Sequence, residues 1–484
     1  MAWPGLIAMQ NDLQLAAQLE QQGKRDDAEA CYRRLIAGQP TLAVARFNFA
    51  CFLRRGARLE EALAEHQKAL DLGIDHPEEV LSNMGVIFTE LRRDDSARDY
   101  LERALAVDPD YIPALYNLAL LHEEFGDLPL ALKLFEKILD LNPAYHNALI
   151  HIAHAQAVAG PGSPVVRKLR RALRRSQVDP LTRESLHFAL AKTLDDCGRC
   201  DEAFAQYELG NRVSATRLAR YDRKAEEDRV DEILQTFTPE WLASREPVSD
   251  RPLVFITGMF RSGSTLIEQV LAAHPGVSAG GEIDYFGRQF ALSGRPFPVA
   301  VAAFDSAGWK EFGAGYIDYI DRTFPAGTIV TNKRPDAFPW LGLLKAMFPN
   351  ARFVNTVRDS LDTCLSIYFQ QLDGQVAYAN DLANIAHHCA QYRRLMTHWK
   401  RLFGASIFDA VYDDYVADPR AVTHALLKFL DLPWHEGCLA FERLGNRVRT
   451  ASVWQVREPV YRKSSGRWKN YERQLEPIRR QLAD

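Results

Sequence analysis

Small residues recur through the first half of the 484-residue chain at a spacing of 34 or 35 positions. They mark one register at Ala28, Ala62, Ala97 and Ala131. A second small residue lies 12 positions before each of these, at Ala16, Ala50, Gly85 and Ala119. Prolines close the units at Pro40, Pro77, Pro109 and Pro143. This period predicts a solenoid of antiparallel helical hairpins, in which the small residues let paired helices approach closely.

The clearest unit covers residues 114–143, and the pattern resembles the tetratricopeptide repeat over about residues 9–143. A fifth unit, at about residues 146–180, is degenerate because glycines and prolines interrupt it. A sixth unit is marked by Leu190, Ala191, Gly198, Ala203 and Tyr207. We therefore expect about six hairpins over residues 9–215. The concave face of such a solenoid commonly receives a protein or peptide partner, and a purely structural scaffold is the open alternative.

The pattern changes after the repeats. Residues 216–248 predict one further helix that caps the solenoid and a proline-rich linker that joins it to a second domain at 249–484. Strand-like runs and helical patterns then alternate, which argues for a parallel sheet with helices on both faces. The expected strands cover residues 253–257, 328–331, 352–357 and 407–412. The expected fold class is therefore multi-domain, an all-α solenoid followed by a P-loop-like α/β domain.

The first of these strands runs into a glycine loop between Gly258 and Gly263, and a helical pattern follows. Such a loop arranges backbone N–H groups around an anion, most plausibly a phosphate. The spacing matches the start of a nucleotide-binding P-loop, but Ser264 stands where that motif has lysine. This substitution argues against a kinase or NTPase. A cation is still present in the loop as Arg261, whose guanidinium can bind phosphate oxygens in bidentate fashion.

A second anion site is suggested by Arg358, which follows a strand, and by Ser366, eight residues later on the next helix. Alone this pair is a weak signal, because Arg358 could cap a helix or pair with Asp359. Beside the first loop it gains weight. A nucleotide with phosphates at both ends would need two separated anion-binding sites.

These residues resemble the sulfotransferases that use 3'-phosphoadenosine 5'-phosphosulfate (PAPS), and most closely their tyrosylprotein branch. The resemblance covers about residues 250–470 in order, and with the repeats the chain is similar to a group of bacterial tetratricopeptide-repeat sulfotransferases. It continues through His274-Pro275, Gly280-Gly281-Glu282, Asn332-Lys333, Tyr412-Asp413-Asp414, residues 427–434, residues 452–456 and Arg467-Trp468.

The resemblance implies a role for each matching residue. Glu282 would be the general base, with Arg261, Lys333 and Ser452 on the sulfuryl group and its bridging oxygen. The residues implied to bind the nucleotide are Arg261, Ser262, Gly263, Ser264, Thr265, Arg358, Ser366, Tyr412 and Arg467. PAPS would be the donor and adenosine 3',5'-bisphosphate (PAP) the product, and no metal is expected.

Three positions depart from the family pattern. Phe260 replaces a proline, and Ser264 replaces a threonine. Asp284 stands where the tyrosylprotein branch has an arginine that meets acidic peptides, so one charge in the acceptor cleft is reversed. The acceptor hydroxyl is therefore left open among a peptide tyrosine, a carbohydrate, a lipid headgroup and a small molecule. A repeat-based adaptor with a non-catalytic nucleotide-binding domain is the alternative function.

Composition limits the partners and the cellular compartment that we expect for the protein. The net charge of −4 gives no overall attraction to nucleic acid, and no apolar run is long enough to cross a bilayer. The N-terminal segment carries no basic residue before its apolar stretch, so no signal peptide is expected. Seven scattered cysteines favour the reducing cytoplasm. Cys197 and Cys200 have a redox or zinc spacing, but without a second pair we expect a turn between helices.

Overall fold

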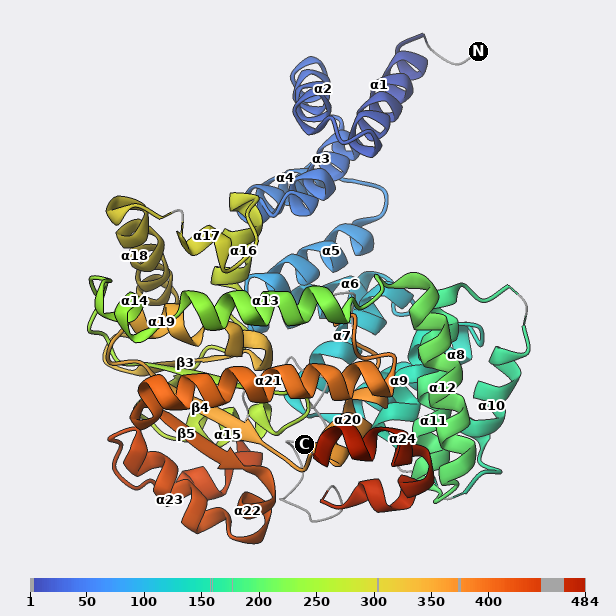
Figure 1. The fold of residues 1–484 in the computed structure, drawn as a ribbon. Coiled ribbons are helices and arrows are strands. Elements are labelled where there is room, and N and C mark those ends of the chain that lie inside the picture. The colour runs from blue at the N-terminus through green and yellow to red at the C-terminus, as the bar shows by residue number, and fades with distance from the viewer. Residues whose placement is uncertain are drawn as a thin grey trace. The chain divides into compact units, whose positions relative to one another are not determined.

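The structure is a computed structural model, and it describes residues 4–156, 158, 160–175, 177–302, 304–372, 376–444 and 465–483. Contacts within the chain divide it into two compact units, Met1–Ile152 and Ala153–Asp484. The first unit is helical, and the second combines further helices with a parallel sheet (Figure 1).

The first unit is a series of helical hairpins. Its helices are α1 (Pro4–Gln21), α2 (Arg25–Gly38), α3 (Ala43–Arg55), α4 (Leu59–Asp71), α5 (Pro77–Glu90), α6 (Asp94–Val107), α7 (Ile112–Phe125), α8 (Leu128–Leu141) and α9 (His146–Ala155). The small residues that mark the repeat are buried where paired helices meet, and Ala28, Ala62 and Ala97 are fully buried. At Gly85 an added Cβ would lie 2.7 Å from the Leu101 side chain. The predicted all-α repeat fold is confirmed for this part of the chain, and its extension to residue 215 stays a prediction.

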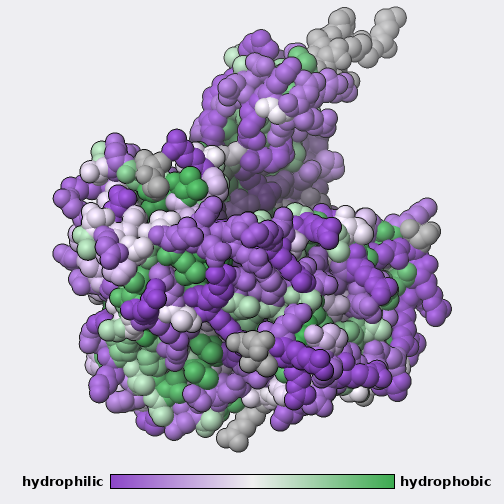
Figure 2. All heavy atoms as spheres, in the orientation of Figure 1, coloured by the Kyte–Doolittle hydropathy of each residue, from purple (hydrophilic) through white to green (hydrophobic). Residues whose placement is uncertain are grey.

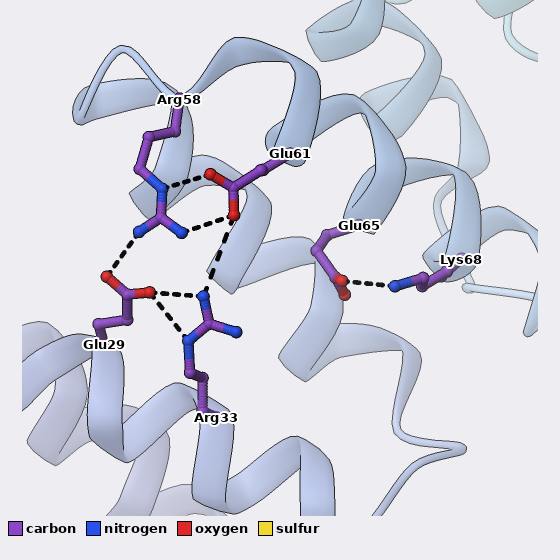
Figure 3. A network of polar contacts seen from close by, with 6 residues as sticks. All are labelled: Glu29, Arg33, Arg58, Glu61, Glu65 and Lys68. Atoms are coloured by element: carbon purple, nitrogen blue, oxygen red, sulfur yellow. Dashed lines mark hydrogen bonds and ion pairs between the residues drawn. The ribbon is translucent and has the colours of Figure 1, made fainter.

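An ion-pair network links the first two hairpins (Figure 3). Arg58, at the start of α4, contacts Glu29 of α2 at 2.6 Å and Glu61 of its own helix at 2.5 Å. Arg33 contacts the same Glu29 at 2.6 Å. Because most of these side chains are substantially exposed, solvent screens each pair and its contribution to stability is small. The network therefore aligns the hairpins, and their stability comes mainly from the buried apolar contacts.

The second unit begins with α10 (Pro164–Leu173), α11 (Pro180–Asp196) and α12 (Cys200–Arg217), of which α11 and α12 form a closely packed hairpin. Gly198, with φ of 70°, makes the turn between them. Cys197 and Cys200 flank this glycine as free thiols, so the predicted inter-helix turn is confirmed.

A five-stranded parallel sheet forms the centre of the second unit. Its strands are β1 (Leu253–Gly258), β2 (Val277–Ala279), β3 (Ile329–Lys333), β4 (Arg352–Val357) and β5 (Ile407–Val411), in the order β2-β3-β1-β4-β5. All pairings are parallel, which confirms the predicted sheet. The three-residue β2 had no counterpart among the expected strands.

Helices cover both faces of this sheet (Figure 1). The helices that follow α12 in this unit are α13 (Arg223–Thr236), α14 (Pro239–Ala243), α15 (Ser264–Ala272), α16 (Tyr285–Ser293), α17 (Val299–Ala302), α18 (Ser306–Thr323), α19 (Leu341–Met347), α20 (Ser360–Tyr368), α21 (Leu382–Phe403), α22 (Tyr412–Ala417), α23 (Pro419–Phe429) and α24 (Glu472–Ala483). Short 3₁₀ turns lie at η1 (Pro335–Trp340), η2 (Gly404–Ser406), η3 (Glu436–Leu439), η4 (Phe441–Arg443) and η7 (Arg467–Tyr471).

Strand β1 shows how apolar side chains fill both faces of the sheet. Val254 and Ile256 pack with apolar residues of α15 and α23, whereas Phe255 stacks on Tyr316 of α18 at 6.1 Å between ring centroids. All six residues of β1 are buried, as expected for a central parallel strand. The continuous apolar run of the sequence is thus explained by burial on two sides.

The helix expected between the two sequence regions is α13, and it lies alongside α21 (Figure 1). His387 and His388 of α21 each contact a glutamate of α13, at 3.1 Å to Glu227 and 3.1 Å to Glu226. The histidine pair therefore has structural partners. Figure 2 shows a mostly hydrophilic outer surface over these two helices.

The helices of the described residues include none with the length and apolarity required to cross a bilayer.

Candidate active site

Three predicted site residues, Lys333, Arg358 and Tyr412, lie at or directly after the ends of strands in one sheet. Pairing aligns Ile256 of β1 with Lys333 of β3, and Gly258 of β1 with Thr356 of β4. Arg358 follows β4, and Tyr412 follows β5. Because parallel strands end at one edge, these residues gather where ligands bind in open α/β sheets.

The loop after β1 is held in a conformation that requires its glycines. Gly258 has φ of 149° and Gly263 has φ of 105°. The Ser262 hydroxyl donates to the Met259 carbonyl at 2.6 Å and shares a 2.6 Å hydrogen bond with the Thr356 hydroxyl. The loop is therefore braced against β4, and it leads into α15 at Ser264 and Thr265. Thr356 was not among the expected site residues.

The two predicted anion sites meet in the structure. The Arg261 Nε donates to the Ser366 hydroxyl at 3.2 Å, and the Arg358 Nη1 donates to the Arg261 carbonyl at 3.2 Å. The Arg358 guanidinium lies 4.9 Å from the centre of the Tyr412 ring. An added Cβ at Gly263 would lie 3.0 Å from that same ring. Two guanidinium groups, a hydroxyl and the start of α15 thus form one basic cluster.

Glu282 and Lys333 form an ion pair beside this loop. The Lys333 Nζ donates to the Glu282 Oε1, and only 1% of the lysine side chain is exposed, compared with 49% of the glutamate. The Lys333 backbone N–H also donates to the Gly281 carbonyl at 2.8 Å. A buried ammonium is costly without a partner, so this pair fixes the charged ends of both side chains at the strand edge.

A second carboxyl lies beneath this pair. Glu268 of α15 is buried, and its Oε1 accepts from the Gly281 backbone N–H at 2.9 Å and the Thr331 hydroxyl at 3.0 Å. Burial raises the pKa of Glu268, and the nearby Lys333 opposes that rise. Glu268 therefore anchors the segment that presents Glu282. It was absent from the expected site.

Glu268→Gln is expected to make stability less dependent on pH. The raised pKa means that the folded protein binds this proton more tightly than the unfolded chain does. The tighter binding of this proton adds to the free energy of unfolding. This contribution of Glu268 is fully present below the ordinary pKa of a glutamate carboxyl, and it is lost as pH rises through the pKa of Glu268 in the folded protein. Glutamine keeps an acceptor oxygen and does not titrate. Urea unfolding followed by tryptophan fluorescence should show the wild type losing stability relative to the variant as the pH rises above the ordinary carboxyl pKa and through the raised folded-state value. If the free energy of unfolding depended on pH equally in the wild type and in the variant, the expectation would be contradicted.

Asp284, where the sequence departs from the family pattern, is paired. Its carboxylate accepts from Arg334, whose guanidinium also contacts Asp336 at 2.7 Å and lies 5.6 Å from the centre of the Trp340 ring. Burial disfavours the charged arginine, but the two carboxylates outweigh it and raise the pKa of Arg334. The reversed charge is thus balanced by a partly buried arginine.

Arg467 lies in a turn that is bound to α20. Asp362 of α20 accepts from the backbone N–H groups of Gly466 at 2.6 Å and Trp468 at 2.8 Å. The Arg467 side chain itself donates to Asp195 of α11. Ser452, the remaining residue expected near the sulfuryl group, lies outside the described residues.

Three residues of this site were not predicted, namely Thr356, Glu268 and Asp362. A threonine two positions before Arg358 is a usable signal, because it lies next to the end of the strand that Arg358 follows. Glu268 and Asp362 are acidic residues on helices, and a helical carboxylate usually faces solvent. Only the packing of the chain identifies these two carboxyls as buried.

Comparison with known proteins agrees with this architecture. Residues 252–436 match the model of a sulfotransferase family, and residues 87–146 match a tetratricopeptide repeat model. An uncharacterized protein of Aquifex aeolicus is 29% identical over 420 residues, which are 84% of this chain and 54% of that protein. Protein-tyrosine sulfotransferase 1 of Danio rerio is 29% identical over 230 residues, 43% of this chain and 61% of the relative.

The human protein-tyrosine sulfotransferase 1 is 28% identical over 227 residues, 43% of this chain and 58% of the relative. The chain thus spans between 54% and 61% of the length of these relatives. In this chain, a region similar to the tetratricopeptide repeat is thus followed by a region similar to the sulfotransferase family.

Proposed function

We propose that the protein transfers a sulfuryl group from PAPS to an acceptor hydroxyl and releases PAP. The observation that carries this proposal is the contact between the half-exposed Glu282 carboxylate and the buried Lys333 ammonium, beside the loop that contains Arg261. A base open to solvent and a cation held within the site are the two groups that such a transfer needs. The sulfotransferase family match supports the reaction class.

The basic cluster supports PAPS as the donor. Gly258 and Gly263 have left-handed backbones, and added Cβ atoms there would meet Thr356 and Tyr412. Backbone amides of the loop can therefore approach phosphate oxygens closely. Arg261, with Ser262, Ser264 and Thr265, would bind the 5' end of the donor.

The second group of residues would bind the 3'-phosphate. Arg358 and Ser366 each contact Arg261 of the loop, and Tyr412 packs against both the loop and Arg358. We propose that Arg467 contributes to the same end of the nucleotide. Ser452 would lie near the transferred group.

The chemistry follows from the positions of the two charged side chains. Glu282 would remove the proton of the acceptor hydroxyl as that oxygen bonds to sulfur. The bond between sulfur and the bridging oxygen of the donor breaks in the same step. Lys333 and Arg261 would stabilise the negative charge that develops on the bridging oxygen and on the sulfuryl oxygens. Glu282 holds the proton at the end of the step. The electron pair of the broken bond between sulfur and the bridging oxygen leaves with PAP.

The acceptor would carry a hydroxyl without a cluster of acidic groups. Asp284 and Asp336 flank Arg334, so the guanidinium near Glu282 is already neutralised. An acidic peptide would find no unpaired cation at this position among the described residues. A tyrosine in a neutral or basic peptide, a carbohydrate and a small phenol all satisfy this requirement.

We further propose a cytoplasmic setting and a protein or peptide partner for the repeats. All seven cysteines are within the described residues and are free thiols, as is usual in a reducing compartment. The repeat match supports a role in protein interaction.

Arg358→Ala is expected to weaken PAP binding by roughly 10- to 100-fold, the effect of losing a hydrogen bond to a charged group. Calorimetric titration with PAP, ATP and AMP should show selective binding of PAP by the wild type and loss of that selectivity in the variant. The matched control is Arg352→Ala, because Arg352 begins the same strand and contacts Asp431 at the opposite end.

Other outcomes would favour other functions. Tight PAP binding without turnover on any tested hydroxyl acceptor would favour an adaptor with a non-catalytic nucleotide domain. Preference for ATP with Mg²⁺-dependent hydrolysis would favour an NTPase and would contradict the proposal.

A further inference from the structure

The turn that carries Arg467 is attached to the helix that carries Ser366. Asp362, 1% exposed, lies four residues after Arg358 and four before Ser366 on α20. Its two oxygens accept from the backbone N–H groups of Gly466 and Trp468, one on each side of Arg467. The backbone of Arg467 is therefore fixed relative to the proposed 3'-phosphate residues.

The side chain of Arg467 is held from a different direction. Asp195, near the end of α11, accepts from the Arg467 guanidinium with one oxygen and from the Tyr471 hydroxyl with the other. The guanidinium also lies 5.3 Å from the centre of the Phe369 ring. Burial disfavours its charge, but Asp195 more than compensates and raises the pKa of Arg467. A carboxylate of the sixth predicted hairpin thus orients a residue of the proposed donor site.

The hairpin itself is docked on the end of α20. Tyr207 of α12 stacks on Phe369 with 3.8 Å between ring centroids and 9° between planes. Asn211 donates to the Tyr368 carbonyl at 2.9 Å, and Ser185 of α11 donates to Gln371 at 2.8 Å. Both helices of the hairpin therefore contact the segment that directly follows Ser366.

We propose that the α11–α12 hairpin is part of the donor site and that Asp195 is a positioning residue for recognition of the 3'-phosphate. This inference rests on the proposed function, since it assigns Arg467 to the 3' end of PAPS. Asp195 does not contact the nucleotide. It acts by holding one guanidinium nitrogen, Nη2, so that the remaining N–H groups are presented in one orientation. The solenoid end thereby contributes to donor affinity.

The test compares Asp195→Asn with Asp196→Asn in the full-length protein. Asp196 is the matched control, because this neighbour pairs with Lys192 at 2.7 Å and not with Arg467. The probes are PAP and adenosine 5'-phosphosulfate, which lacks a 3'-phosphate. Asp195→Asn is expected to weaken PAP binding by about 10-fold, the loss of a charge-assisted contact, and to leave adenosine 5'-phosphosulfate binding unchanged. The control variant is expected to bind both ligands like the wild type.

Kinetics and a double-mutant cycle distinguish a positioning role of Asp195 from a role in the stability of the fold alone. The KM for PAPS should rise in Asp195→Asn while kcat at saturation is retained. Asp195→Asn should have no further effect on PAP binding once Arg467→Ala is present, because the two residues act through one another. Asp195→Glu should recover part of the affinity.

Three results would overturn the inference. The first is wild-type PAP affinity in Asp195→Asn. The second is an equal loss of affinity for both ligands together with a lower Tm, which would indicate only a structural role. The third is that the effects of Asp195→Asn and Arg467→Ala on PAP binding free energy add fully in the double variant. Failure of the wild type to bind PAP would instead remove the proposed function, and this inference with it.

Discussion

Replacing Glu282 by glutamine is expected to lower the rate of sulfuryl transfer by about 10²- to 10⁴-fold, the usual contribution of a general base. The amide keeps an oxygen that can accept from Lys333 but cannot take a proton from the acceptor hydroxyl. Because none of the proposed contacts to the nucleotide phosphates involves Glu282, PAP affinity should change little. Initial rates with PAPS and calorimetry with PAP measure the two effects separately.

The control for this substitution is Glu246→Gln. Glu246 is another exposed glutamate paired with a lysine, Lys310, at 3.0 Å, and it lies before the first strand. It should retain wild-type turnover. Loss of PAP binding in Glu282→Gln would contradict the assignment of Glu282 as a base, because it would mean that the Glu282–Lys333 pair maintains the nucleotide site.

Gly258→Ala is expected to abolish detectable PAP binding and to destabilise the second unit. An added Cβ would lie 2.5 Å from both the carbonyl and hydroxyl oxygens of Thr356 and 2.8 Å from the Ser262 hydroxyl. The backbone φ of 149° is also strained for any L side chain, at a cost of about 1–3 kcal/mol. The loop must move away from β4, and its amides then leave the positions suited to phosphate. Calorimetry and urea unfolding measure the two losses.

Gly404→Ala provides the contrast. Gly404 has helical backbone angles, and the nearest atom to an added Cβ is 4.0 Å away. This variant should bind PAP normally and be as stable as the wild type or slightly more stable. Normal PAP binding by Gly258→Ala would mean that the loop does not hold the donor phosphates.

The sequence was most informative where local pattern and tertiary role coincide. The run before Gly258 is apolar throughout because β1 is buried on both faces, and the glycines mark backbone angles that few other residues adopt. The repeat was equally predictable, since small residues such as Ala62 can recur only where helices meet. In both cases the residue type is required by its own backbone or by its immediate neighbour.

Other features depend on contacts that no local pattern encodes. Strand β2 has three residues and exists because β3 lies beside it. Glu268 and Asp362 are buried because Gly281 and the turn around Arg467 supply their hydrogen-bond donors from distant parts of the chain. In the sequence, nothing distinguishes Asp195 from other residues near a helix end. Its partner, Arg467, lies 272 positions later. Such pairings can be recognised only after the chain has folded.

The docking of α11 and α12 also bears on how the second unit unfolds. The Tyr207–Phe369 stack and the bonds of Asp195 join the hairpin that we predicted as the sixth repeat to elements of the sheet domain. Segments that share buried contacts open together in hydrogen exchange. The cooperative unit is then Ala153–Asp484, so a shortened chain cut between the hairpin and β1 would leave apolar rings and a buried arginine without their partners.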